Sequence, residues 1–336
     1  MVLQSRASRC VLGALCAALL SFLPCTAAPT LPLGTAADLP LPGNATRLDY
    51  QSLDPHRHLL FIAHLGDSSV VAVDTRTRRV VATIANVSDV HGVLAVPQLG
   101  TVYASATGTN EVAAIDETTF AIKARASGGV YPDGIAFDPG THRIFVSDEH
   151  GQTDTVIDTR TNRRIATIAL GGDVGNSQFD AASKHVFVNV QTLGQLVEID
   201  PVKNAIVRRV TLSGTSCVGN HGLLIDAARR RAFIACEDSN TFLWLDMRTM
   251  RVIEEWPIGE GPDVLAIDPQ THRLFVAAES GIVSVFEDAD RVTRVAQAFL
   301  APAAHTVSVD PQTHLVYFPL QDISGKPVLR IFEQTR

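Results

Sequence analysis

Six of seven regularly spaced positions carry side chains that can bind a metal ion or transfer a proton. We call these positions the inner ring; successive members lie 42 residues apart, except for one interval of 46: Asp49, His91, Asp133, Gly175, His221, Asp263 and His305. Imidazole and carboxylate groups together are good ligands for divalent metals. Clustered carboxylates beside histidines also shift one another's pKa values, which suits acid–base chemistry. We predict that the three histidines bind one divalent metal ion of unspecified identity. The three aspartates and Asn176, which follows the glycine, are predicted to bind a ligand.

A second set of positions, which we call the outer ring, follows each inner-ring position by 16 residues: Leu65, Thr107, Glu149, Gln191, Glu237, Glu279 and Gln321. We predict that its three glutamates act as catalytic bases or as further metal ligands. His64, directly before this set, is predicted to bind a ligand. The alternative is structural, because Asp and His near the start of a strand also cap turns and bond exposed backbone amides.

Both rings belong to a repeat that fills most of the chain. Its marker is an aspartate before a turn, as in DPGTHR, and the seven markers stand at Asp54, Val96 (in place of an aspartate), Asp138, Asp180, Asp226, Asp268 and Asp310. Each unit holds several short apolar runs between turn residues, for example GIAFD, IFVSD, DTVID and RRIATIA. Runs of this length, rich in Val, Ile, Phe and Thr, predict strands rather than helices.

Four strands per unit, repeated seven times, predict an all-β fold, a seven-bladed β-propeller. The first strand of a unit leaves one face and the second returns to it, so we expect both rings at one mouth of the central tunnel. The last unit, ending in PVLRIFEQTR, lacks a fourth strand. We predict that residues 36–41 supply it, which closes the ring and removes an exposed edge. The propeller is expected over residues 44–336, after a lead-in and closing strand at 29–43.

The first 28 residues differ from the rest of the chain. Two arginines precede an apolar run from Cys10 to Leu23, and small residues follow at Thr26 to Ala28. This pattern predicts a cleaved secretory signal peptide, and hence a periplasmic or extracellular protein without a transmembrane segment. The 26 basic and 35 acidic residues that remain give a formal charge of −9. Because phosphate binding needs a basic surface, a nucleic-acid partner is not expected.

Two of the five cysteines, Cys217 and Cys236, lie outside the predicted signal peptide. An oxidising compartment would allow them to pair, and the bond would hold the four-residue expansion of the repeat near His221. Two separate thiols are the alternative.

We expect the mature protein to be a monomer.

The repeat resembles the YncE-type, YVTN-repeat family of secreted seven-bladed propellers. The similarity covers residues 40–336 and is carried by RLDYQSLDPHRHLLFIAHLGDSSVVAVD, YPDGIAFDP, GPDVLAIDPQTHRLFVAAESG and VSVDPQTHLVYFPL. The resemblance implies the fold and export. One member of the family is associated with single-stranded DNA, a role that the acidic charge of this chain does not support.

Three functions are compatible with the two rings. The first is an exported propeller that binds a small molecule or a divalent metal ion at the tunnel mouth. The second is a metal-dependent enzyme at the same site, similar to propeller lactonases and lyases, in which a metal polarises a carbonyl group and His or Glu moves a proton. The third is a protein-interaction platform without catalysis.

Overall fold

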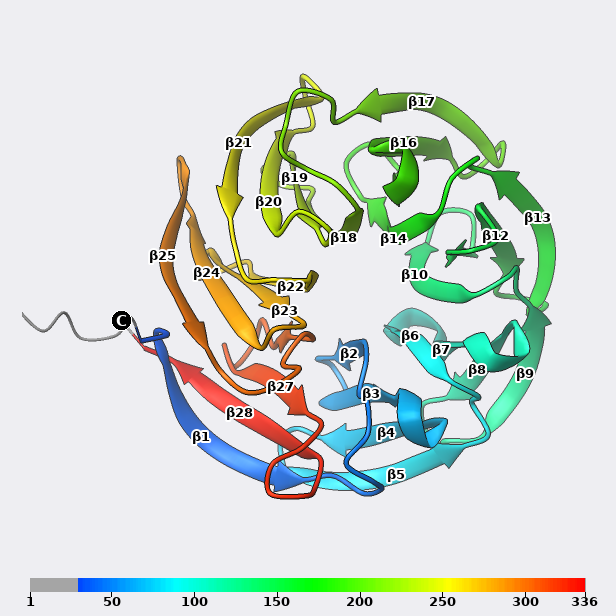
Figure 1. The fold of residues 1–336 in the computed structure, drawn as a ribbon. Coiled ribbons are helices and arrows are strands. Elements are labelled where there is room, and N and C mark those ends of the chain that lie inside the picture. The colour runs from blue at the N-terminus through cyan, green and yellow to red at the C-terminus, as the bar shows by residue number, and fades with distance from the viewer. Residues whose placement is uncertain (1–29, 336) are drawn as a thin grey trace, which may run out of the picture.

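The protein is described here by a computed structural model, which covers residues 30–335. Seven four-stranded antiparallel sheets form a closed ring around a central axis (Figure 1). The all-β, seven-bladed propeller predicted from the repeat is therefore confirmed. The predicted signal peptide, residues 1–28, lies outside the described residues.

Each blade contributes one strand to each of four layers around the axis. The innermost strands are β2 (Gln51–Asp54), β6 (Val90–Val96), β10 (Pro132–Asp138), β14 (Val174–Asp180), β18 (Asn220–Asp226), β22 (Pro262–Asp268) and β26 (Ser308–Val309). The second strands are β3 (Leu59–His64), β7 (Thr101–Ala106), β11 (Arg143–Asp148), β15 (His185–Val190), β19 (Arg231–Cys236), β23 (Arg273–Ala278) and β27 (Val316–Leu320). We number the blades 1 to 7 in this order.

The two outer layers complete the blades. The third strands are β4 (Ser69–Asp74), β8 (Glu111–Asp116), β12 (Thr153–Asp158), β16 (Gln195–Asp200), β20 (Thr241–Asp246), β24 (Ile282–Asp288) and β28 (Val328–Gln334). The outermost strands are β5 (Arg79–Ala85), β9 (Ile122–Ser127), β13 (Arg163–Ala169), β17 (Ala205–Thr211), β21 (Arg251–Pro257), β25 (Val292–Phe299) and β1 (Leu33–Pro40). In the described residues the only helices are four 3-10 turns, η1 (Leu65–Asp67), η2 (Pro97–Leu99), η3 (Thr107–Thr109) and η4 (Gln191–Leu193). None of them is long and apolar enough to cross a membrane.

The ring closes as the repeat predicted. Strand β1 pairs antiparallel with β28, so the first and last segments of the propeller share blade 7. The ion pair between Asp38 and Arg330 adds to this contact, with 2.7 Å between Arg330 Nη2 and Asp38 Oδ2. The strand begins three residues before the predicted Ala36 and ends at Pro40.

The marker aspartates end the innermost strands by binding the turn that follows. Asp54 Oδ1 accepts hydrogen bonds from the backbone N–H groups of His56 and Arg57, and Asp268 Oδ1 does the same for Gln270 and Thr271. An aspartate bonding the backbone two or three residues on is a turn-forming device. In blade 2, where Val96 replaces it, the 3-10 turn η2 with Pro97 takes over this role.

The hydrophobic core consists of seven clusters, one at each interface between neighbouring blades. Side chains alternate along a strand, so every blade presents one apolar face to the preceding blade and one to the next. Phe233 of β19 packs with Leu274 of β23 at the interface of blades 5 and 6, for example. Leu60 of β3 packs with Leu329 of β28 where blade 1 meets blade 7. No blade can bury both faces alone, which explains why the pattern repeats.

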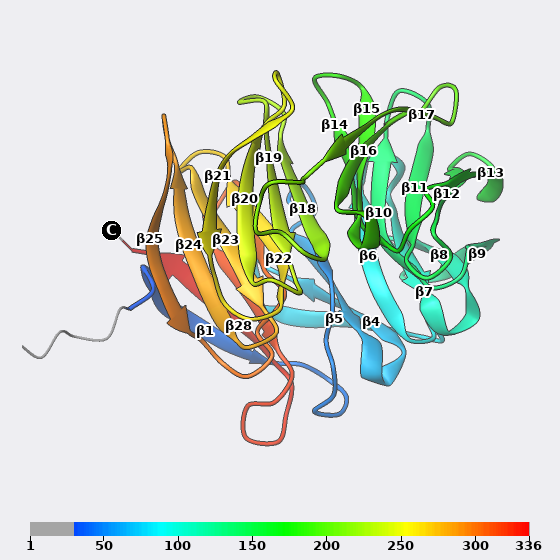
Figure 2. The same ribbon diagram turned by 45° about the horizontal axis from the view of Figure 1, so that its top comes forward.

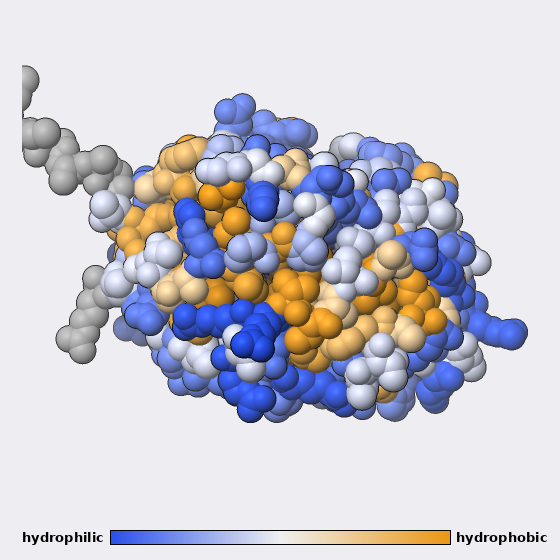
Figure 3. Space-filling view, turned by 90° about the horizontal axis from the view of Figure 1, so that it is seen from below, coloured by the Kyte–Doolittle hydropathy of each residue, from blue (hydrophilic) through white to orange (hydrophobic). Residues whose placement is uncertain are grey.

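The outermost strands carry β-bulges that interrupt their exposed edges. In β5 the pairing with β4 shifts between Ala82 and Val80, which leaves Val81 as the extra, exposed residue. Ile165 and Ile253 occupy the same position in β13 and β21. Bulges on edge strands hinder pairing with another chain. On the outer surface of the ring, where β1 and β5 lie, apolar side chains are exposed among hydrophilic ones (Figure 3).

Candidate functional site

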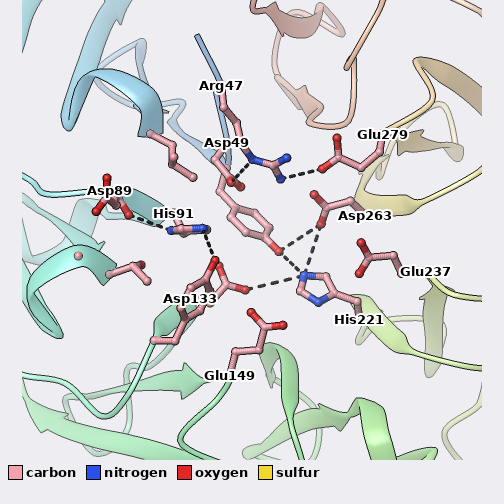
Figure 4. A pocket seen from close by; sticks show the side chains of 15 residues that line it. Arg47, Asp49, Asp89, His91, Asp133, Glu149, His221, Glu237, Asp263 and Glu279 are labelled. Atoms are coloured by element: carbon pink, nitrogen blue, oxygen red, sulfur yellow. Dashed lines mark hydrogen bonds and ion pairs between the residues drawn. The ribbon is translucent and has the colours of Figure 1, made fainter.

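A cavity of about 680 Å³ opens at one mouth of the central tunnel. The tilted view of Figure 2 shows the strands of each blade running between the two faces of the ring, so one face collects a loop from every blade. Five inner-ring residues line the cavity: Asp49, His91, Asp133, His221 and Asp263. The three outer-ring glutamates line it as well: Glu149, Glu237 and Glu279 (Figure 4). The structure therefore brings eight of the eleven predicted site residues together.

Bulges at the start of the innermost strands turn the inner-ring side chains toward the cavity. In β10 the pairing with β11 shifts between Pro132 and Ile135, and Asp133 lies in the shifted segment. The same shift contains His221 in β18 and Asp263 in β22. A bulge adds an unpaired residue and redirects its side chain, which is common beside functional sites.

Three predicted residues do not line the cavity. His64 is buried at the end of β3, where its Nε2 atom lies 3.1 Å from Thr46 Oγ1, and burial lowers its pKa. It ties the segment before β2 to the second strand of blade 1. Asn176 lies deeper, in a narrower part of the tunnel that it lines together with Tyr50. The third residue, His305, lies behind the cavity wall and is 1% exposed.

Tyr50 is the main site residue that the ring alignment missed. Its hydroxyl group lies 2.8 Å from His221 Nε2 and donates to Asp263 Oδ1 at 3.2 Å, so it reaches from blade 1 to blades 5 and 6. A signal for it is present in the sequence. Three of the seven positions directly after the inner ring are glycines, at residues 92, 134 and 222, whereas blade 1 has a tyrosine.

The glycines are required by close packing around the axis. A Cβ atom on Gly92 would lie 2.0 Å from the carbonyl oxygen of Asp133, and one on Gly222 would lie 2.0 Å from that of Asp263. Gly175, the exception in the inner ring, is equally constrained, because a Cβ atom there would lie 2.6 Å from the carbonyl oxygen of His221. Neighbouring innermost strands thus touch at backbone level, and the side chain of Tyr50 enters the space that they leave.

A chain of hydrogen bonds links the inner ring below the cavity. His221 Nε2 meets Tyr50, and Tyr50 donates to Asp263. Asp263 Oδ2 lies 2.8 Å from His305 Nδ1, and His305 Nε2 lies 2.9 Å from the Leu48 carbonyl oxygen, to which it donates. Both nitrogens of His305 therefore face acceptors, an arrangement that favours the protonated ring.

The pKa values in this chain follow from burial and from the neighbouring charges. Burial lowers the pKa of His305, but its hydrogen bond and ion pair with Asp263 outweigh this and raise the pKa to about 9. The pKa of His221 is raised to about 9 against the same burial effect, by Asp263 and Asp133. Burial raises the pKa of Asp263, yet the bond from His305 and the charge of His221 bring it below its ordinary value.

The predicted set of three metal-binding histidines is not assembled in one place. His91 Nδ1 donates to the Asp89 carbonyl oxygen at 2.8 Å, and its Nε2 lies 3.0 Å from the Tyr131 hydroxyl. His221 Nδ1 lies 2.8 Å from the side-chain amide of Gln191. All six ring nitrogens of His91, His221 and His305 thus already have protein partners. Histidines at the inner-ring position therefore act as hydrogen-bonding groups. The residue type alone does not distinguish this role from that of a metal ligand.

One group of side chains has the spacing of a metal site. Ligand atoms of Asp49, Asp263 and His305 lie within 4.8 Å of one another. The group is buried, and two protein cations already touch it. Arg47 Nε lies 3.2 Å from Asp49 Oδ2, and His305 is paired with Asp263. An ion in this group would have to displace the proton of His305.

The roles predicted for the glutamates as catalytic bases stay predictions.

The charges of the cavity are predominantly negative. Seven carboxylates line it, together with the single guanidinium of Arg47 and the two histidines: Asp49, Asp89, Asp133, Glu149, Glu237, Asp263 and Glu279. Burial raises the pKa of Asp133 well above its ordinary value, although His221 opposes the shift. Burial also raises the pKa of Glu237. Both shifts mean that these carboxylates lack sufficient counter-charge.

A disulfide bond borders the cavity. Cys217 and Cys236 are bonded, with 5.3 Å between their Cα atoms. Cys236 directly precedes Glu237, whose backbone N–H donates to the Gly219 carbonyl oxygen at 2.8 Å. The bond therefore fixes the expanded loop of blade 5 against the residue that carries one of the cavity glutamates.

Comparison with known proteins supports the fold. No protein-family model matches the chain, and a search of curated proteins gave no significant match. Among solved structures, hydrazine synthase of Kuenenia stuttgartiensis is similar with a TM-score of 0.73 and 15% identity over 92% of this chain and 99% of that chain. U3-55K is similar with a TM-score of 0.75 and 12% identity over 89% and 99%. At these identities the likeness shows the architecture alone: the chain is a seven-bladed β-propeller.

Proposed function

We propose that this chain is an exported β-propeller that binds a small cation, either a divalent metal ion or a positively charged small molecule, in the cavity at the tunnel mouth. The observation that carries the proposal is Asp133. It is 2% exposed, and its Oδ1 atom has no hydrogen-bond partner among the described residues. Figure 4 shows its carboxyl group directed into the cavity.

An unpaired buried carboxyl group is costly unless a partner satisfies it. A cation in the cavity would supply the counter-charge that His221, 3.8 Å from Asp133 Oδ2, provides only in part. The excess of carboxylates over basic groups in the lining favours a cation over an anion as the ligand. The histidines then act as hydrogen-bond partners that hold the carboxylates in place.

Export is supported by the disulfide and by the sequence. Cys217 and Cys236 are bonded in the structure, and such bonds persist in oxidising compartments. The first 28 residues have the pattern of a signal peptide, and the YncE-type resemblance implies the same location. A chain beginning near residue 29 in the extracytoplasmic fraction would support export, and a full-length chain kept in the cytoplasm would contradict it.

The proposal is tested by titrating calcium, zinc and spermidine into the mature protein in a calorimeter. We expect at least one of these cations to bind the wild type, with an affinity at least tenfold lower for Asp133→Asn. The matched control is Asp290→Asn, an exposed aspartate in the turn between β24 and β25. Absence of binding by all three cations would overturn the proposal, and so would equal binding by the two variants.

A further inference from the structure

The carboxylates of the cavity divide into a paired and an unpaired set. The paired set is Asp49, Asp263 and Glu279. Arg47 lies 3.2 Å from Asp49 and, through Nη2, 2.7 Å from Glu279 Oε1. His305 Nδ1 lies 2.8 Å from Asp263 and 3.4 Å from Glu279. Each carboxylate on this side of the cavity therefore already has a protein cation as its partner.

The unpaired set is Asp133 and Glu149 of blade 3 together with Glu237 of blade 5, and Asp133 has only the 3.8 Å contact with His221. The seventh cavity carboxylate, Asp89 of blade 2, has no ion pair with any described residue either and lies on the side of His91 (Figure 4). Neither Glu149 nor Glu237 makes a side-chain hydrogen bond or an ion pair with any residue from 30 to 335. His221 of blade 5 is the basic group that reaches toward Asp133 of blade 3 (Figure 4). Its ring nitrogens are held by Tyr50 and Gln191. Together with Asp89, these three carboxylates are left for a ligand.

The unpaired set does not converge on a point. Within residues 30–335, the Asp49, Asp263 and His305 group alone has ligand atoms close enough together for a single metal ion. A metal ion needs its oxygen ligands at about 2.0–2.6 Å, and in the described residues Asp133, Glu149 and Glu237 do not form a group with ligand atoms within 4.8 Å of one another. A molecule with separate positive groups can contact them.

The acidic lining continues outward from the cavity. A hollow of about 470 Å³ on the same face shares Glu237 and Glu279 with the cavity and adds Asp238 and Glu260. No lysine or arginine is among the residues that line this hollow. The cavity itself is also larger than a hydrated metal ion requires and falls in the usual range for small-molecule sites. The two spaces together form an elongated acidic site.

An aromatic wall completes the site on the side of blade 3. Tyr131 lines the cavity, and its ring lies 5.0 Å from that of His91 and 4.5 Å from that of His150, between ring centroids. The face of a tyrosine attracts an ammonium group electrostatically. Tyr131 stands two residues before Asp133, so an ammonium group bound by Asp133 would lie near this ring.

We propose that the ligand is an organic cation with two or more ammonium groups, a linear diamine or polyamine, held by Asp133, Glu149 and Glu237. The inference rests on the proposed function and specifies its ligand class. One ammonium group is bound between Asp133 and Glu149 beside Tyr131, and a second is bound at Glu237 toward the outer hollow. The alkyl chain between them crosses the mouth above blade 4, where Gly175 presents no side chain.

The test compares methylammonium, 1,4-diaminobutane and spermidine by calorimetry on the mature protein at one fixed ionic strength near 0.15 M. We expect affinity to rise at least tenfold from the first probe to the last. Glu149→Gln/Glu237→Gln should weaken spermidine binding at least tenfold. The control with the same change in net charge is Glu287→Gln/Glu333→Gln, two exposed glutamates on β24 and β28, which should bind as the wild type does.

Two results would overturn the inference. One is spermidine binding no tighter than methylammonium, and the other is equal weakening by the two double variants, which would show a general charge effect. Calcium or zinc binding that depends on Asp133, without amine binding, would overturn the inference and leave the proposed function standing. If neither metal ions nor amines bind, both fall. Circular dichroism of each variant confirms that the fold is intact.

Discussion

At the scale of single residues, the buried His305 shows how a positive charge is held by neighbouring acceptors in the site. It faces Asp263, Asp49, Glu279 and, across the last of these, Arg47. Its two nitrogens bind Asp263 and the Leu48 carbonyl oxygen, so the ring is held in its protonated form. Asp133 is the opposite case, a carboxyl group without enough counter-charge. The first residue is satisfied by other protein groups, and the second is available to a ligand.

The raised pKa of His305 predicts a pH-dependent stability. A histidine whose pKa rises from 6.5 to about 9 on folding contributes its full stabilisation below pH 6.5 and loses it as the pH rises through 9. The contribution is on the order of 3 kcal/mol. We expect the free energy of unfolding in urea to fall from pH 6.5 to pH 9 in the wild type, and less so in His305→Gln. Equal slopes in the two proteins would rule out this role of His305.

At the scale of elements, the bulge at the start of five of the seven innermost strands positions the site. It places Asp133, His221 and Asp263 over the cavity, while the glycines that follow let neighbouring backbones touch. The second strand of each blade returns to the same face and brings the glutamates. In blade 5 the loop before the bulge is four residues longer than in the other blades, and the disulfide fixes it.

Loss of this disulfide should destabilise the protein. A bond that closes a loop with a sequence separation of 19 residues is expected to contribute about 3 kcal/mol, mainly by restricting the unfolded chain. We expect Cys217→Ser/Cys236→Ser to unfold at a lower urea concentration than the oxidised wild type. Added reductant should lower the wild-type midpoint and leave the variant unchanged. A wild-type midpoint that does not respond to reductant, with full reduction verified by a thiol assay, would contradict the prediction.

At the scale of the whole molecule, the closed ring holds the mouth in shape. Strand β1 is the only element that links the beginning of the described chain to blade 7, and it completes a sheet whose other three strands come from the C-terminal end. Leu41 and Leu329 are packed in the cluster between blades 7 and 1. Opening this contact would expose the edge of β28 and one interface between blades.

Removal of β1 should therefore affect the entire ring. We expect a chain that begins at residue 41 to unfold at a temperature at least 10 °C lower than one that begins at residue 29, or to aggregate through the exposed β28 edge. Thermal unfolding and size-exclusion chromatography measure both effects. Substitution of Asp38 by Asn, which breaks only the ion pair with Arg330, is the mild control. A truncated chain that remains monomeric with unchanged thermal stability would refute this view of closure.

The sequence by itself determined the architecture of this protein and the membership of most of its cavity. The fold follows because a blade with two apolar faces has to be repeated and closed, so the spacing of markers such as Asp54 and Asp138 is sufficient to count the blades. The cavity follows because equivalent positions of the repeat meet around one axis. That is why the repeat alone groups Glu279, at the end of a buried strand, with Glu149 and Glu237.

Only the tertiary structure decided which of these groups are already bonded to one another. Repeat alignment gives the ring position of a side chain but not its direction or its partner across the axis. Tyr50 reaching His221 and Asp263, and His305 bonding back to Leu48, join blades that lie far apart in the sequence. These contacts engage the histidines and Asp263, while the carboxyl groups of Asp133, Glu149 and Glu237 make no hydrogen bond with any described side chain. The physical reason is that a local pattern fixes strands and bulges, whereas the pairing of charges across a cavity depends on distances that only the closed ring sets.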